Sequence, residues 1–175
     1  MRHPIRHRRG FTLVEILCVV VIMGIAAAMI VPAIGTRNDL NAASGARAMM
    51  ADLTYAQNRA IATQSMQYVS FNVAGQSYSI CSSMSPLTYV THPVNLTNYI
   101  TTFGAGELSL CSLVSVNFNS GPTVLAFDEL GAPYAYNTTT QVATAISGTG
   151  QIVVQSGQVS LTVSIQQYTG QMTVN

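Results

Sequence analysis

The spacing of apolar residues changes twice along the chain and divides it into three parts. Residues 11–34 are almost continuously apolar, residues 35–66 carry apolar residues every three or four positions, and residues 67–175 tend to alternate apolar with polar positions. These periods predict helix in the first two parts and β-strands in the third. We therefore expect an α+β fold, in which a long N-terminal helix with a membrane half and an amphipathic half packs on an antiparallel β-sheet domain.

The amphipathic half of the helix is predicted from Ala46, Met49, Leu53, Ala56 and Ala60, which follow one another at intervals of three or four. We expect this face to pack against the sheet. Between the two halves, Pro32 removes one helical hydrogen bond, and Gly35, three residues later, adds backbone freedom. The sequence therefore predicts a kink at Pro32.

The β domain is expected to begin with a hairpin of residues 69–73 and 77–81, joined by a turn at residues 74–76. A long connection over residues 86–102 carries His92. The further predicted strands are residues 108–118, 123–127, 151–155, 159–165 and 171–174.

The first apolar part is long enough to cross a membrane. Its 24 residues extend about 36 Å as a helix, compared with about 30 Å of hydrocarbon. Four of the seven arginines lie within residues 1–10, and basic flanks tend to stay on the cytoplasmic side. We expect a single-pass topology with the N-terminus in the cytoplasm and the β domain outside.

Glu15 is unusual because it lies just inside this apolar part. A carboxylate at the centre of a membrane helix costs about 2.5 to 3.5 kcal/mol, and less near the interface, so it calls for a partner. A cleaved signal peptide, with a cut after residues 26–28, and a plain signal anchor are two interpretations, and both leave Glu15 unexplained. A cut between Gly10 and Phe11 would supply the partner, because it creates an amino group at Phe11.

Residues 8–15, Arg-Arg-Gly-Phe-Thr-Leu-Val-Glu, resemble the start of type IV pilin and pseudopilin precursors. The resemblance implies a leader peptide of residues 1–10, cleavage after Gly10 by a prepilin peptidase that also N-methylates Phe11, and a role for Glu15 in assembly with a neighbouring subunit's Phe11 amine. Pro32 falls where the family often has a helix-bending proline. The implied fold is pilin-like, with an assembly helix at residues 11–34, an amphipathic helix at 35–66 and a periplasmic β domain at 67–175.

Three short patterns in the rest of the chain resemble GspH/FimT-type minor pilins and pseudopilins. They are residues 56–61 at the end of the helix, the Phe-Asp-Glu-Leu-Gly-Ala-Pro turn at residues 127–133, and the Tyr-Thr-Gly-Gln-Met hairpin at residues 168–172. The resemblance implies a structural subunit of a type II secretion pseudopilus or a type IV pilus, located in the bacterial inner membrane before assembly. Its implied partners are the peptidase, the membrane and other pilin subunits.

The distribution of charge argues against nucleic-acid binding. Lysine is absent, and no lysine or arginine follows Arg59. Binding to nucleic acid depends on such side chains to neutralise phosphates. Removal of residues 1–10 would leave three arginines against six acids, a formal charge of about −3. We therefore expect no nucleic-acid partner, even though some FimT-like proteins are linked to DNA uptake.

The three cysteines suggest at most one disulfide. Cys18 lies in the apolar helix, whereas Cys81 and Cys111 lie in the distal domain, where they can pair in an oxidising compartment. The sequence leaves that bridge open as a candidate.

Residues suited to catalysis are scarce. Outside the first ten residues His92 is the only histidine, and neither a nucleophile elbow nor a phosphate-binding loop is present. We predict no enzyme, no cofactor and no metal, although Asp128 and Glu129 are adjacent acids in a turn. The alternative to a structural subunit is a pilus-tip or membrane-anchored binding module that captures a surface, a glycan or a secreted substrate.

Overall fold

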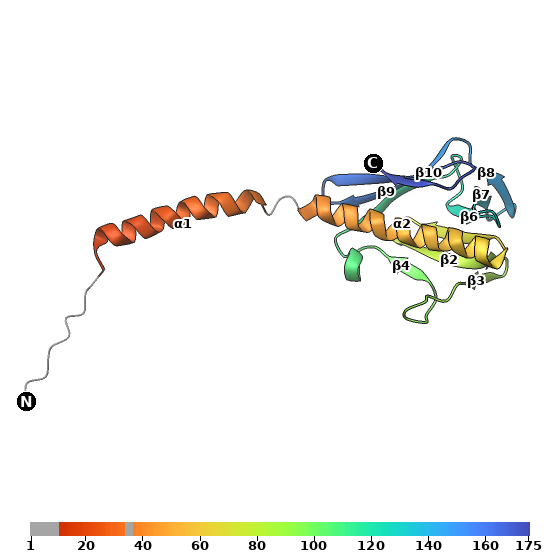
Figure 1. The fold of residues 1–175 in the computed structure, drawn as a ribbon, viewed down its shortest axis with the longest axis horizontal. Helices are drawn as coiled ribbons and strands as arrows, with labels where there is room; N and C mark the ends of the chain where they lie inside the picture. Colours follow the sequence, from red (N-terminus) through yellow and green to blue (C-terminus); the bar gives the residue numbers. More distant parts are fainter. Residues whose placement is uncertain (1–10, 34–36) are drawn as a thin grey trace, which may run out of the picture. The chain divides into compact units, whose positions relative to one another are not determined.

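The computed structural model describes residues 11–33 and 37–175, which form two compact units. The first unit contains α1 (Leu13–Ala33), and the second, Asn38–Asn175, contains almost all of α2 (Arg37–Thr63) and the β-strands (Figure 1). The strands are β1 (Gln67–Asn72), β2 (Ser77–Met84), β3 (Leu87–Tyr89), β4 (Ile100–Thr102), β5 (Ser112–Asn117), β6 (Val124–Phe127), β7 (Pro133–Asn137), β8 (Val142–Ala145), β9 (Thr149–Ser156), β10 (Val159–Gln166) and β11 (Met172–Val174). A 3-10 turn, η1 (Gly106–Leu108), precedes β5. The predicted α+β class is confirmed.

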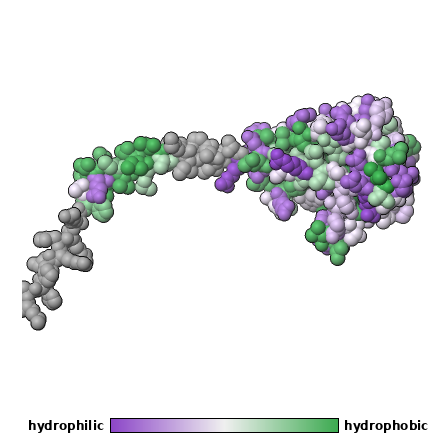
Figure 2. All heavy atoms as spheres, in the orientation of Figure 1, coloured by the Kyte–Doolittle hydropathy of each residue, from purple (hydrophilic) through white to green (hydrophobic). Residues whose placement is uncertain are grey.

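Helix α1 presents apolar side chains to its surroundings, including Leu13, Val14 and Leu17, which are 83%, 66% and 61% exposed. Figure 2 shows this apolar surface along the described part of α1. Pro32 lies in the last turn of α1, and residues 34–36 lie outside the described residues, so the kink stays a prediction. No helix within residues 11–33 and 37–175 is both long and apolar enough to cross a membrane.

Helix α2 packs on the strands through the face that the sequence predicted. Its buried residues are Ala42, Gly45, Ala46, Met49, Leu53, Ala56 and Ala60. Small residues on this face allow close approach: a Cβ at Gly45 would lie 2.9 Å from the Cys111 sulfur. The main core forms between α2 and the facing strands, with Phe71, Tyr78, Phe118 and Ile152 among its large side chains.

The strands of the predicted antiparallel β domain form two antiparallel sheets. The larger has the order β3-β2-β1-β6-β7-β8, with β4 also pairing with β2, and the smaller has the order β11-β10-β9-β5. The predicted hairpin β1–β2 is present, and the predicted strands 151–155 and 159–165 pair with each other as β9 and β10. In contrast, β5 and β6 are neighbours in sequence but belong to different sheets. Within residues 86–102, expected to be a connection, β3 and β4 add short strands to β2.

The larger sheet curls so that its two outer hairpins meet. Gln141, in the β7–β8 turn, donates from Nε2 to Ser85 Oγ in the β2–β3 turn at 3.5 Å, although these hairpins lie at opposite ends of the strand order. The curl encloses a second apolar cluster on the face away from α2, where Val124, Ala126 and Tyr136 are buried. Both faces of this sheet therefore contribute to the core.

None of the strands β1–β11 contains a charged residue. The charged side chains of residues 37–175 lie in α2, in η1 and in the turn at Asp128 and Glu129. The sheets are held together by backbone pairing, apolar contacts and neutral hydrogen bonds. The few charges are consequently gathered on the helix and two connecting segments.

Candidate functional site

The predicted processing site adjoins the start of α1. Gly10 and the leader residues 1–10 lie outside the described residues, whereas Phe11 is described and is 77% exposed. The Glu15 N–H donates to Thr12 Oγ1 at 3.2 Å and to the Thr12 carbonyl at 3.1 Å. Thr12 is therefore the N-cap of the helix, and Glu15 occupies the third helical position.

This position gives Glu15 a local role that the sequence analysis missed. Thr-x-x-Glu is the spacing of a capping box, and a carboxylate in the first helical turn interacts favourably with the helix dipole. Glu15 is exposed, and Thr12 stabilises the helix start through the backbone of Glu15.

The three distal patterns meet at one side chain. Gln57, near the end of α2, donates from Nε2 to the Gly131 carbonyl at 2.8 Å and to the Thr169 carbonyl at 3.2 Å. It thereby joins the turn at residues 128–132 to the hairpin at residues 168–171. These segments are more than 35 residues apart in the sequence, yet one amide fastens both to the helix.

Two glycines make this junction possible. Gly131 and Gly170 both have positive φ, 81° and 65°. A Cβ at Gly170 would lie 2.8 Å from the Gly131 carbonyl oxygen and 2.5 Å from Gln57 Nε2. Only glycine combines this backbone conformation with so close an approach.

A second polar cluster is centred on Asp52, in the middle of α2. Its Oδ2 accepts hydrogen bonds from Tyr78 at 2.7 Å and Thr101 at 3.1 Å, and its Oδ1 accepts one from Tyr99 at 2.9 Å. The three hydroxyl groups come from β2, β4 and the residue before β4. No sequence pattern indicated this cluster, apart from the place of Asp52 on the polar side of α2.

The Asp52 cluster perturbs the two tyrosines. Burial, and then the charge and hydrogen bond of Asp52, raise the pKa of Tyr78 well above its ordinary value. The same causes raise the pKa of Tyr99. Both phenols therefore remain protonated donors to the carboxylate at neutral pH.

A depression of about 460 Å³ lies beside this cluster, between α2 and the segment from β4 to η1. Its lining includes Asp52, His92, Asn95 and Glu107. The His92 ring lies 4.4 Å from the Tyr99 ring, and its Nδ1 accepts a hydrogen bond from the Val94 N–H at 3.2 Å. The predicted connection thus folds His92 back against the domain.

The adjacent acids Asp128 and Glu129 belong to a turn. Asp128 Oδ1 accepts from the N–H groups of Leu130 at 3.0 Å and Ala132 at 2.8 Å. The Asp128 carboxylate thus has a structural role, because it binds backbone N–H groups of its own turn. No group of three or more metal-ligating side chains occurs in the described parts of the chain.

The candidate bridge between Cys81 and Cys111 is not formed, since both thiols are free and buried. Cys111 packs against Gly45 of α2 and donates to the Asn41 carbonyl at 3.2 Å. Cys81 is paired with Tyr68 across β1 and β2, on the face that carries the second cluster. The two thiols lie on opposite sides of the larger sheet, which separates their sulfur atoms.

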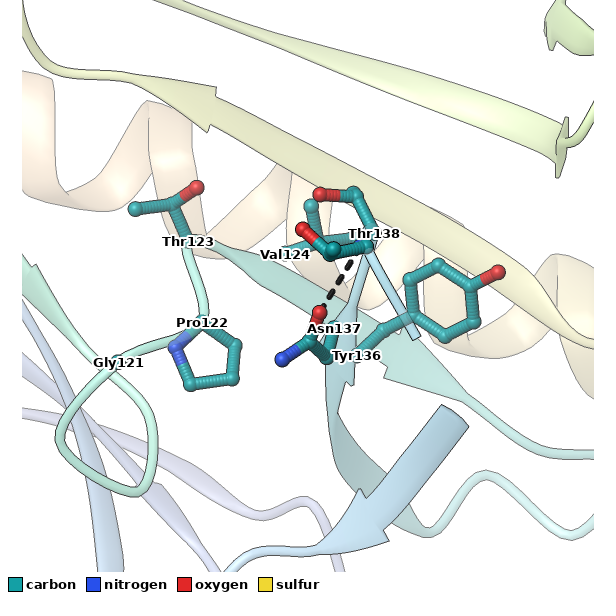
Figure 3. Close-up of a pocket in the computed structure, with 8 residues that line it drawn as sticks. Gly121, Pro122, Thr123, Val124, Tyr136, Asn137 and Thr138 are labelled. Atoms are coloured by element: carbon teal, nitrogen blue, oxygen red, sulfur yellow. Dashed lines mark hydrogen bonds between the residues drawn. The ribbon is translucent and has the colours of Figure 1, made fainter. Parts of the chain in front are cut away.

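A further small pocket, of about 230 Å³, lies between the loop before β6 and the end of β7. Figure 3 shows Pro122 on one side of it and Asn137 on the other, with Thr123 and Thr138 nearby. Asn137 Oδ1 accepts from the Thr139 N–H at 2.9 Å. The pocket lining is neutral, which suits hydrogen bonding rather than ionic recognition.

Comparison with known proteins gives one family match. The profile described as the prokaryotic N-terminal methylation motif matches residues 5–31. No curated protein matches the chain. Two crystal structures of the Pseudomonas aeruginosa type IV minor pilin FimU are similar to it: one with 14% identity, a TM-score of 0.46 and coverage of 75% of this chain and 90% of FimU, the other with 16%, 0.48, 80% and 91%. Residues 5–31 thus carry a prokaryotic N-terminal methylation motif, which confirms the predicted resemblance of this segment to type IV pilins and pseudopilins.

Proposed function

We propose that the chain is the precursor of a minor pilin or pseudopilin, a structural subunit that is processed at its N-terminus and then assembled through α1. The methylation motif at residues 5–31 is the observation that carries this proposal. The motif places a glycine directly before Phe11 and a glutamate at position 15. Cleavage between Gly10 and Phe11 by a prepilin peptidase, with N-methylation of Phe11, follows from it.

The surface of α1 supports assembly as the role of this helix. Its exposed apolar side chains have no partner in the unit that contains α1, within residues 11–33. Burial of such surface contributes about 25 cal/mol per Å², so a helix of this kind is stabilised when it enters a membrane or a bundle of similar helices. We propose that residues 11–34 do both, first in the inner membrane and later in the filament.

The site residues have separate roles in this proposal. The Glu15 carboxylate pairs with the Phe11 amine of a neighbouring subunit, and Pro32 bends the helix between its two halves. The domain from residue 67 onward faces the periplasm and contacts other subunits. We further propose that the subunit is of the GspH/FimT type, in a type II secretion pseudopilus or a type IV pilus.

Mass spectrometry of the mature protein tests the proposal directly. Purified from a host that contains a prepilin peptidase, the chain should begin at Phe11 with one added methyl group. A mature chain that begins near Met29 would establish removal of an ordinary signal peptide. An intact chain that begins at Met1 in the same host would contradict processing altogether.

A second candidate function, a binding module at a filament tip, is favoured by the depression beside Asp52. This depression combines two carboxylates, an imidazole and an amide over about 460 Å³. A glycan screen with the wild type and a Glu107→Gln variant distinguishes this function from a purely structural one. Binding that the variant weakens would support it.

A further inference from the structure

The loop between β3 and β4 is fixed at its base but has few contacts at its tip. At the base, the His92 N–H donates to the Thr97 carbonyl at 2.7 Å. At the tip, the Val94 and Leu96 side chains are 83% and 76% exposed, so burial contributes little to their position. Figure 1 shows this loop extending away from the strands. The conformation of the tip therefore depends on a few hydrogen bonds.

One of these bonds requires a particular protonation state of His92. Because Pro93 has no N–H, Val94 supplies the first N–H after His92, and it donates to His92 Nδ1 at 3.2 Å. An imidazole nitrogen accepts a hydrogen bond only while it carries no proton. The bond therefore assigns the neutral ring to the tautomer with its proton on Nε2, and Nδ1 is the atom that a second proton would enter.

Addition of that proton turns an attractive contact into a repulsive one. The protonated Nδ1 and the Val94 N–H are then two donors that face each other, and the Val94 N–H loses its acceptor. The loop also contains backbone strain, since Leu96 has a positive φ of 58°. Because so few bonds hold the tip, loss of this one shifts the balance from the closed loop to more open conformations.

The titratable groups that face the imidazole are two tyrosines and two carboxylates. The His92 ring lies against Tyr99, with ring centres 4.4 Å apart, and Tyr99 in turn stacks on Tyr55 of α2. Asp52 and Glu107 line the same depression as His92, and among the described residues that line it none is lysine or arginine. Asp52 already accepts three hydroxyl bonds, whereas Glu107 is exposed. Carboxylates in the depression thus attract a protonated ring away from the loop.

We propose that His92 is a pH-sensitive latch, a side chain whose hydrogen bond holds this loop closed in one protonation state only. With Nδ1 unprotonated, the bond from Val94 closes the loop, and His92 and Asn95 form one wall of the depression beside Asp52. With Nδ1 protonated, the loop opens and this wall withdraws. The depression therefore widens as pH falls through the range of about 5 to 8 in which histidines gain their charge.

NMR spectroscopy of the full chain in detergent, from about pH 5 to 8, tests the latch independently of N-terminal processing. As the His92 ring is protonated, the protection of the Val94 amide against hydrogen exchange should fall about two- to tenfold, with the same midpoint as the ring signals. The Tyr99 ring, which packs against His92, should become more accessible to an uncharged paramagnetic agent over the same range. Unchanged protection of the Val94 amide would overturn the proposal.

Two variants separate the effect of the proton from that of the bond. In His92→Asn, the amide oxygen can accept the Val94 N–H as in an Asx turn but is not protonated in this range, so the loop should stay closed throughout. In His92→Phe, a ring can still pack on Tyr99 but offers no acceptor, so the loop should be open at every pH. A wild-type pH response in His92→Asn would overturn the proposal, because Asp52 or Glu107 would then be the titrating group. So would a protected Val94 amide in His92→Phe.

Discussion

At Asp52, one carboxylate holds hydroxyl groups from β2, β4 and the residue before β4 against α2. Hydrogen bonds to a charged group contribute about 1.5 to 3 kcal/mol each, more than neutral ones. Because Tyr78 and Tyr99 are buried, loss of their acceptor also leaves polar hydroxyls without a partner. Asp52 therefore positions the segment that carries His92 and η1.

The variant Asp52→Asn should lower the free energy of unfolding by about 1.5 to 3 kcal/mol. Its amide nitrogen cannot accept the two hydroxyl bonds that Oδ2 now receives. Urea unfolding followed by tyrosine fluorescence measures the change. Glu107→Gln, at an exposed carboxylate, is the control and should stay within about 0.5 kcal/mol of the wild type; an equal effect in both variants would argue against the cluster.

The stability of the wild type and that of Asp52→Asn should also depend differently on pH. The folded chain retains protons on Tyr78 and Tyr99 above pH 10.0, the ordinary pKa of tyrosine, whereas the unfolded chain releases them. The stability contributed by these groups is complete below that pH and is lost as pH rises above it. In Asp52→Asn the loss should end at a lower pH and be smaller in total, because the Asp52 charge no longer raises the two pKa values; equal total losses in wild type and variant would argue against a role of the Asp52 charge.

Among the elements, the C-terminal hairpin depends on the junction of Gln57 with two glycine turns. Gly170→Ala should lower the free energy of unfolding by about 1 to 3 kcal/mol, because the added Cβ meets the Gly131 carbonyl and the backbone has positive φ. Thermal and urea unfolding measure this effect. Gly121→Ala is the control, because a Cβ at Gly121 meets nothing within 4 Å; similar losses in both variants would contradict the junction.

The elements also show which parts of the fold can be predicted from local pattern. Alternation predicted the hairpin β1–β2, because both strands and their turn are adjacent in sequence. It did not predict that β5 and β6 enter different sheets, or that β7 and β8 exist as strands. These features depend on pairing with strands elsewhere in the chain, which the period of a single segment does not determine.

In the candidate site, too, local features could be predicted from the sequence and contacts between distant segments could not. The motif around Phe11 and Glu15 lies within a few residues and was visible in the sequence. The partners of Asp52 lie 26 to 49 residues away in the sequence, so this cluster has no local sequence signature. The Gln57 contacts could be predicted only in part. The three sequence patterns were identified separately, but their meeting at Gln57 was not predicted.

For the whole molecule, the proposed function predicts a separation between processing and assembly in Glu15→Val. The change removes the carboxylate that would pair with a neighbouring Phe11 amine. It leaves the cap of α1 intact, because Thr12 binds the backbone N–H of residue 15. The mature variant should appear in the membrane fraction and be lost from sheared filaments, as measured by immunoblot of both fractions.

Glu107→Gln, which changes a carboxylate far from α1 in sequence, is the control and should enter filaments normally. Incorporation of Glu15→Val at the wild-type level would show that the carboxylate has no part in assembly. Loss of the variant from the membrane fraction would instead indicate a role for Glu15 in insertion.

The absence of charge from strands β1–β11 has a consequence for the kinetics of recognition. Electrostatic attraction accelerates encounter and is weakened by salt, whereas neutral surfaces associate at about 10⁵ to 10⁶ M⁻¹s⁻¹. A partner that binds the sheets should therefore arrive at a rate that ionic strength hardly alters. Contacts through these sheets would be insensitive to changes in the salt around the domain, including those expected at its proposed periplasmic location.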